Sequence, residues 1–121
     1  MKSVILTKFG GPDVLQVQEF DSPQPKSNEV RIKVHYAGIN FAEIMARMKL
    51  YPGGPKPPCV LGGEVSGVID KVGDNVQGLD VGQNVMGLSL NGSYSSQVCM
   101  DSSSIIPLPS NSFFATPTKV E

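Results

Sequence analysis

Few residues in this 121-residue chain have the types and spacing that catalysis or metal binding needs. The single histidine, His35, stands on the polar side of an alternating segment, where a solvated side chain is expected rather than a catalytic base. The two cysteines, Cys59 and Cys99, lie forty residues apart, so they can form neither a CxxC redox motif nor a zinc knuckle. We expect free thiols in a reducing compartment and no nucleophile paired with a base.

One glycine-rich segment, residues 62–67 (GGEVSG), is a candidate for binding a phosphate group. Phosphate-binding glycine turns stand between a strand and the N-terminus of a helix. This segment opens a strand-like pattern instead, and neither GxGxxG nor GxxxxGK[ST] occurs in the chain. The sequence therefore predicts no Rossmann unit within these residues and no cofactor bound by this chain alone.

The stretch Asn40-Phe41-Ala42-Glu43 has the form of a capping box. In this motif the asparagine side chain accepts a hydrogen bond from the first helical turn, and the glutamate reaches back to the start of the helix. The motif predicts a short helix over residues 41–48. Residues 50–58 (LYPGGPKPP) hold four prolines and two glycines, so an ordered surface loop is expected after the helix.

The remaining pattern consists of strands separated by turns. Alternating residues predict the clearest strand at 29–37, and Asn91-Gly92 is the strongest hairpin signal because both turn positions favour a positive φ. Gly10-Gly11-Pro12-Asp13 predicts a second hairpin connection. The other expected strands are at 3–7, 14–20, 64–72 and 81–90, with an edge strand at 105–108.

Composition excludes several classes of partner. A formal net charge of −1 and a pI of about 5.8 argue against nucleic acid and membrane surfaces as partners. No apolar run approaches the length of about 20 residues that spans a bilayer, and the N-terminal residues lack a secretory core, so a cytoplasmic protein is expected. Short strands and repeated turns indicate a single, mainly β domain, a barrel or sandwich with brief helical decoration.

Three blocks in unbroken order carry a family resemblance, together with FGGPDVL at residues 9–15. The blocks are residues 30–41 (VRIKV through GINF), 62–69 (GGEVSGVI) and 72–87 (VGDNV through VGQNVMG). Over residues 3–109 the chain resembles the N-terminal GroES-like domain of medium-chain dehydrogenase/reductases. The match is to the quinone oxidoreductase branch, which includes zeta-crystallin and the vesicle amine transport protein-like reductases. This resemblance implies a GroES-like, partly open β-barrel with one or two short helices.

The resemblance also implies a domain organisation. Residues 1–109 would be the substrate-binding domain, and residues 110–121 a tail that departs from the family. The family's nucleotide-binding domain is not found in this sequence. Whether the chain is itself an enzyme is left open, because the family's cofactor, NADPH, would be bound only in the intact enzyme.

Zinc-dependent members of this superfamily carry a cysteine at the position of Asn40 and a histidine at the position of Gly63, so the resemblance implies no metal site. It places Asn40 near the nicotinamide and the substrate oxygen, where a neutral amide can donate a hydrogen bond to a developing oxyanion. The alternative is that Asn40 only caps the helix. Tyr51 matches a tyrosine at the mouth of the substrate pocket, or it is a loop aromatic packed on prolines.

Two more positions near the cofactor follow from the resemblance. Glu43 occupies an acidic position of the family, although it could be only the partner in the capping box. Met45 stands where some members have a tyrosine or another polar residue, which removes a hydrogen-bond donor. Glu64 is expected to be a structural carboxylate.

Taken together, these features predict the substrate-binding domain of a zinc-independent, NADPH-dependent quinone or enone oxidoreductase, inactive without its nucleotide-binding domain. Its partner would be a small quinone or enone, and a homodimer is left open. The alternatives are a non-catalytic interaction module or a truncated isoform that retains the barrel. A co-chaperonin shares the fold by analogy only.

Overall fold

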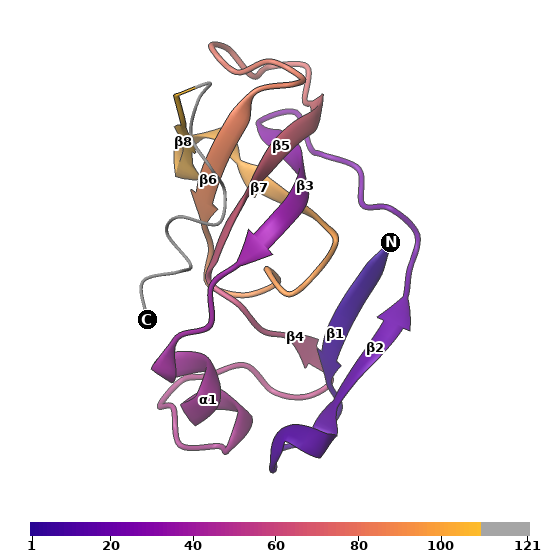
Figure 1. The fold of residues 1–121 in the computed structure, drawn as a ribbon, viewed down its shortest axis with the longest axis vertical. Helices are drawn as coiled ribbons and strands as arrows, with labels where there is room; N and C mark the ends of the chain where they lie inside the picture. The colour runs from indigo at the N-terminus through magenta and orange to yellow at the C-terminus, as the bar shows by residue number, and fades with distance from the viewer. Residues whose placement is uncertain (110–121) are drawn as a thin grey trace.

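The computed structural model describes residues 1–109, which form two antiparallel β-sheets and one α-helix (Figure 1). This confirms the prediction of a mainly β fold. The strands are β1 (Lys2–Leu6), β2 (Leu15–Glu19), β3 (Glu29–Ala37), β4 (Cys59–Val60), β5 (Glu64–Val72), β6 (Asn84–Leu88), β7 (Gln97–Asp101) and β8 (Ile105–Pro107). The helix is α1 (Phe41–Arg47), and the short 3-10 turns are η1 (Pro12–Val14) and η2 (Ser102–Ser104). The tail expected at residues 110–121 lies outside the described residues.

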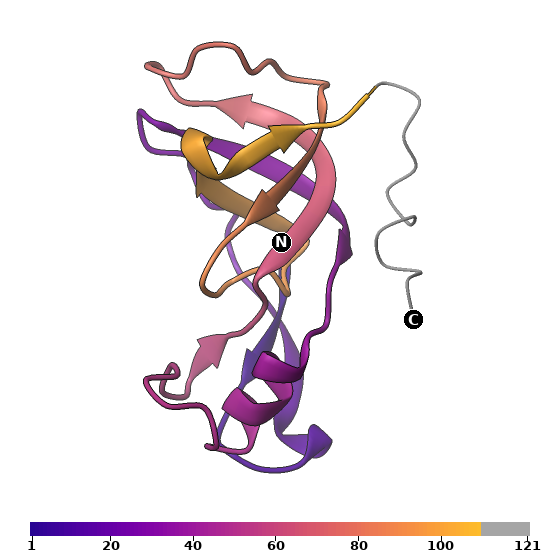
Figure 2. The same cartoon turned by 90° about the vertical axis from the view of Figure 1, so that its left-hand side faces the viewer.

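The larger sheet has the strand order β7-β3-β5-β6-β8 and curls into a partly open barrel (Figure 2). Alternation along its central strands places one face in the core, where Val30, Ile32 and Ile69 are completely buried. Irregularities in the register between β3 and β5, at Arg31/Ile32 and Val34/Tyr36, accompany this curl. His35, which lies between Val34 and Tyr36, is exposed, as the alternation predicts.

The two central strands approach closely at Gly67 on β5. It pairs with Val34 of β3, and a Cβ atom at Gly67 would overlap the carbonyl oxygen of Lys33. Only a residue without a side chain allows the two backbones this separation.

The smaller sheet has the order β2-β1-β4 and shares its end of the molecule with α1 (Figure 2). A second core joins them, because Ala46 on α1 packs with Leu6 on β1 and with Leu61, which follows β4. Burial of this apolar surface fixes the helix against the sheet. Through Ala46, α1 is therefore packed on the smaller sheet.

The predicted hairpin at Asn91-Gly92 is wrong, although Gly92 has the expected positive φ of 100°. The strand before the turn, β6, pairs with β5 and β8, and β7, which follows it, pairs with β3. The backbone N–H of Gly92 instead donates to the Val60 carbonyl at 2.9 Å, and that of Tyr94 donates to Leu61 at 3.0 Å. Long-range pairing with the smaller sheet has overridden the local turn preference.

The other sequence predictions can be compared strand by strand. The strand predicted at 81–90 begins only at Asn84, because residues 81–82 are part of a turn, and the two-residue strand β4 was not predicted. The hairpin between β1 and β2 is confirmed, as is an edge strand, β8, that contains Pro107. Among the described residues, no helix is both long and apolar enough to cross a membrane.

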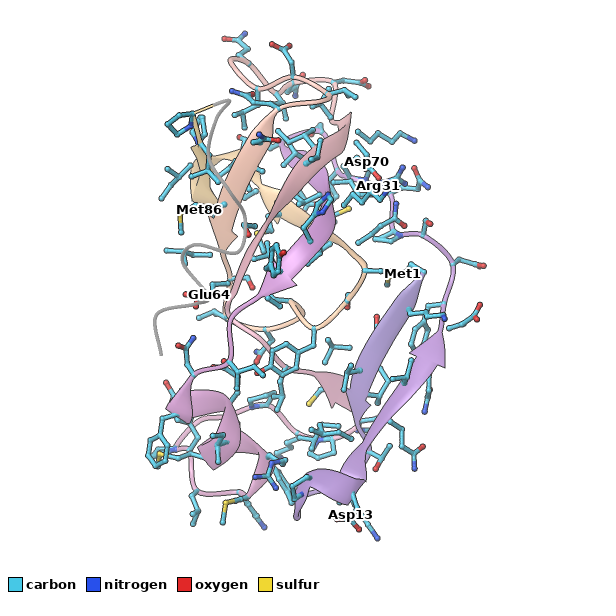
Figure 3. All side chains as sticks on the ribbon, viewed as in Figure 1. Met1, Asp13, Arg31, Glu64, Asp70 and Met86 are labelled. Atoms are coloured by element: carbon cyan, nitrogen blue, oxygen red, sulfur yellow. The ribbon has the colours of Figure 1, made fainter. Side chains whose placement is uncertain are left out.

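An ion pair holds the extended linker between the two sheets. The Arg31 Nε lies 2.7 Å from the Asp70 Oδ1, and the Arg31 guanidinium also donates to the Pro23 carbonyl at 3.1 Å (Figure 3). The Gln97 amide donates to the second Asp70 oxygen at 2.9 Å. One carboxylate thus connects three strands of the larger sheet and fixes the linker on its outer face.

Candidate functional site

A cavity of about 200 Å³ lies where α1, the loop after it and the residues around β4 and β6 meet. Two residues singled out from the sequence, Glu43 and Tyr51, contribute to its wall, and Gly63 contributes from a different segment. The structure therefore brings three predicted positions together from separate parts of the chain. Its lining is Ala42, Glu43, Ala46, Tyr51, Pro55, Leu61, Gly63, Ser89, Leu90 and Asn91.

Asn40 and Glu43 form the capping box that the sequence predicts at the start of α1. The Glu43 Oε1 accepts a hydrogen bond from the backbone N–H of Asn40 at 2.9 Å, and the Asn40 carbonyl accepts one from the Glu43 N–H at 3.1 Å. Asn40 itself is exposed, one helical turn before the cavity wall. The backbone that carries its amide is therefore fixed by a residue that lines the cavity.

Met45, on the next turn of α1, does not line this cavity. It is half-buried, and its carbonyl accepts the backbone N–H of Leu50 at 2.8 Å, which turns the chain into the proline-rich loop. The structure brings Glu43 and Tyr51 to the cavity and leaves Met45 outside its wall.

Sequence reasoning missed Tyr94, which the long-range pairing brings to the site. Its hydroxyl donates a hydrogen bond to the Glu43 Oε1 at 3.5 Å, and its ring packs against Gly62 so closely that a Cβ atom there would overlap it. Tyr94 also lines a second, mainly apolar cavity of about 520 Å³ between the two sheets. The only sign of Tyr94 in the local sequence was that an aromatic residue follows a predicted turn.

Burial raises the pKa of Tyr94 to about 12, and the negative charges of Glu43 and Glu64 add to the effect. Because the phenol is neutral in the folded chain, its contribution to stability is complete below the ordinary tyrosine pKa of about 10. That contribution is lost as the pH rises toward 12, since the unfolded chain releases its proton first.

We expect the Tyr94 ring to remain protonated at a pH of about 11, where an ordinary tyrosine is mostly ionised. The ring carbon shifts of labelled tyrosine, followed by NMR against pH, measure this directly, and Tyr94→Phe identifies the signal. The matched control, Tyr36→Phe, should leave the late titration in place. A Tyr94 signal with its midpoint near 10 would contradict the expectation.

Glu64 is half-buried at the start of β5, beside the chain that leads from β3 into α1 (Figure 3). Its side chain lies over Gly38 so closely that a Cβ atom at Gly38 would overlap the carboxyl group. Glu64, which the sequence predicts to be a structural carboxylate, therefore fills the space beside Gly38. Across residues 1–109, no three His, Cys, Asp or Glu side chains gather as a metal-binding group.

The chain is similar to proteins of established families. Residues 26–110 match the family model described as the alcohol dehydrogenase GroES-like domain. The synaptic vesicle membrane protein VAT-1 homolog-like of Mus musculus is 31% identical over 115 residues, which cover 95% of this chain and 28% of that protein. A quinone oxidoreductase of Salmonella typhimurium is 41% identical over 103 residues, which cover 83% of this chain and 31% of that protein.

A solved structure shows the same arrangement. The Escherichia coli quinone oxidoreductase complexed with NADPH superposes with a TM-score of 0.88 at 35% identity, over 94% of this chain and 35% of that chain. The chain thus spans less than a third of the two curated relatives and about a third of this structure.

Proposed function

Because the chain belongs to the alcohol dehydrogenase GroES-like domain family, within the medium-chain dehydrogenase/reductase superfamily, we propose that it is the substrate-binding domain of a zinc-independent, NADPH-dependent quinone or enone oxidoreductase. The observation that carries the proposal is the cavity shared by Glu43, Tyr51 and Gly63, next to the neutral amide of Asn40. Asn40 and Gly63 stand where zinc-dependent members of the superfamily have cysteine and histidine.

Each residue has a separate part in the proposed reaction. The Asn40 amide would donate a hydrogen bond to the substrate carbonyl, and this bond strengthens as negative charge develops on the oxygen. The Tyr51 ring would stack on the flat substrate, and its phenol can reach a second oxygen. Glu43 would hold the start of α1 through the Asn40 N–H, which positions the amide before substrate arrives.

The described residues would meet one end of the family's cofactor. Asn40 and Glu43 at the start of α1, with Met45 on its next turn, would contact the nicotinamide, which would supply a hydride to the substrate in the intact enzyme. The pyrophosphate fits poorly here, because the carboxylate of Glu43 occupies the helix N-terminus that would otherwise attract it. We therefore expect the 121 residues alone to be inactive with NADPH.

We also propose that the protein is cytoplasmic, that its partner is a small molecule and that it does not bind nucleic acid. Both cysteines, Cys59 and Cys99, are unpaired in the described structure, which agrees with a reducing compartment. The formal charge of −1 gives no attraction to phosphate backbones.

Duroquinone tests the proposal on the 121-residue chain, because its ring is fully substituted and does not add thiols. We expect it to shift the NMR amide signals of Glu43, Tyr51 and Gly63. Tyr51→Ala should weaken binding by about fivefold, as loss of one stacked ring predicts. The same mixture should not consume NADPH above the rate without protein.

Tyr36→Ala is the matched control, since Tyr36 is 41% exposed on β3 and Tyr51 is 48% exposed in the loop. It should leave the affinity unchanged. Shifts that avoid the cavity, or equal losses in the two variants, would argue against a quinone site at this position.

A further inference from the structure

A third cavity, of about 600 Å³, adjoins the first on the other side of Tyr51. The two cavities share Tyr51 and Ala46 in their walls, so they meet at these two side chains. The volume lies within the range of about 300–1,000 Å³ that small-molecule pockets usually have. We call it the lysine cavity. It is lined by Phe9, Ala46, Lys49, Tyr51, Gly53, Gly54, Lys56 and Pro57.

The backbone of Lys49 has an unusual conformation. Its φ of 62° is in the left-handed region, which residues other than glycine seldom adopt. The turn is fixed by the Lys49 N–H, which donates to the Ala46 carbonyl at 3.2 Å, and by the Leu50 N–H, which donates to Met45 at 2.8 Å. The Lys49 ammonium lies 5.6 Å from the centre of the Phe9 ring, within range of a cation–π interaction. The cation is therefore held at the cavity wall by both backbone and ring.

The two adjoining cavities differ in charge. Lys49 and Lys56 line the lysine cavity, and no acidic residue does. The first cavity has Glu43 as its charged lining residue. An anionic group is therefore repelled from one side of Tyr51 and attracted to the other, which gives a polar ligand a preferred orientation across the ring.

We propose that the lysine cavity binds an anionic substituent on an aromatic substrate whose carbonyl end occupies the first cavity. This inference rests on the proposed function and specifies its substrate class: a flat aromatic quinone or enone with a sulfonate, carboxylate or phosphate group on the ring. Phe9 and Tyr51 supply aromatic surface, and Lys49 and Lys56 supply the charge. Because both ammonium groups are exposed, their contribution is modest and depends on salt.

The probe is anthraquinone-2-sulfonate, compared with its neutral sulfonamide, on the 121-residue chain at low salt. We expect the sulfonate to bind about fivefold more tightly, with NMR shifts at Lys49, Gly53 and Gly54. Lys49→Gln and Lys56→Gln together should abolish the difference between the two ligands and leave the affinity of the sulfonamide unchanged.

Lys33→Gln combined with Lys71→Gln is the matched control, because it removes the same two charges from exposed positions on β3 and β5, outside the walls of both cavities. Equal loss of sulfonate affinity in this variant would show an effect of net charge alone and overturn the proposal. The proposal also fails if the sulfonate binds no better than the sulfonamide. Inorganic sulfate provides a further arm: if it displaces the sulfonate at millimolar concentration, the site binds free anions and not a ring substituent.

The result can be separated from the test of the proposed function. Duroquinone carries no charge, so its binding next to Tyr51 does not depend on the lysines. Binding of duroquinone without a preference for the sulfonate would overturn only the anionic subsite. If duroquinone does not bind to the unmodified chain, the quinone site itself is overturned.

Discussion

Replacement of Asn40 by serine is expected to lower turnover by about tenfold or more, with unchanged stability, in a chain that carries a nucleotide-binding domain after residue 109. Serine caps a helix about as well as asparagine does, so the start of α1 should persist. Its hydroxyl is shorter than the amide and would not reach the same carbonyl oxygen. Loss of one oxyanion donor typically costs about 10²–10³ in rate, whereas loss of a cap costs about 0.5–2 kcal/mol of folding free energy.

Asn40→Ala should lower both the turnover and the folding stability, so the pair of variants separates the two roles of the side chain. Initial rates with NADPH and duroquinone give the turnover, and urea unfolding gives the stability. Asn28→Ser, at an exposed position before β3, is the matched control and should alter neither. If Asn40→Ser retains full turnover, the amide is only a helix cap and its catalytic role is wrong.

The substitution Gly67→Ala is expected to reduce the free energy of unfolding by about 3 kcal/mol or more. Its new methyl group would overlap the carbonyl oxygen of Lys33, which belongs to the backbone of the neighbouring central strand and cannot rotate away. The two strands must then separate at the centre of the larger sheet. Since a domain of this size is stable by only about 5–15 kcal/mol, the loss should be plain in urea or thermal unfolding.

Gly78→Ala is the control for Gly67→Ala. Gly78 has a φ of 81°, and no atom lies within 4 Å of the position of an added Cβ. The cost there should be that of a left-handed residue alone, about 1–2 kcal/mol. If the two variants lose the same stability, the close approach of β3 and β5 costs no more than one left-handed residue does, and the loss expected for Gly67→Ala is wrong.

The sequence predicts best where the signal is local. The bounds of β3 and β5 agree with those of the structure, because alternation marks β3 and the turn residues Gly73-Asp74-Asn75 mark the end of β5. The capping box at Asn40 and Glu43 was predicted for the same reason, since its partners are three residues apart. The residues that form α1 could therefore be read directly from the chain.

The rest of the candidate site depends on contacts between distant segments. Tyr94 and Glu43 are 51 residues apart along the sequence, and they meet because residues 92–94 hydrogen-bond to the chain around β4. The Asn91-Gly92 dipeptide indicates a turn but not the strand that follows it. For the same reason the sequence indicated Tyr51 only through a resemblance, and it gave no sign of the cavity beside Lys49.

The contacts of β1 also determine when during synthesis the smaller sheet can be completed. The Val4 N–H donates to the Tyr94 carbonyl at 2.8 Å, and the Ser3 hydroxyl lies 2.8 Å from that of Ser95, 92 residues later. At about 5–20 residues per second, a ribosome needs roughly 5–20 seconds to make that second partner. Until then residues 2–4 of β1 remain unpaired on the edge where β4 covers only Ile5 and Leu6, and they are open to other chains. This part of β1 is thus made long before the segment that covers it, and a nascent chain that ends before residue 96 lacks that segment.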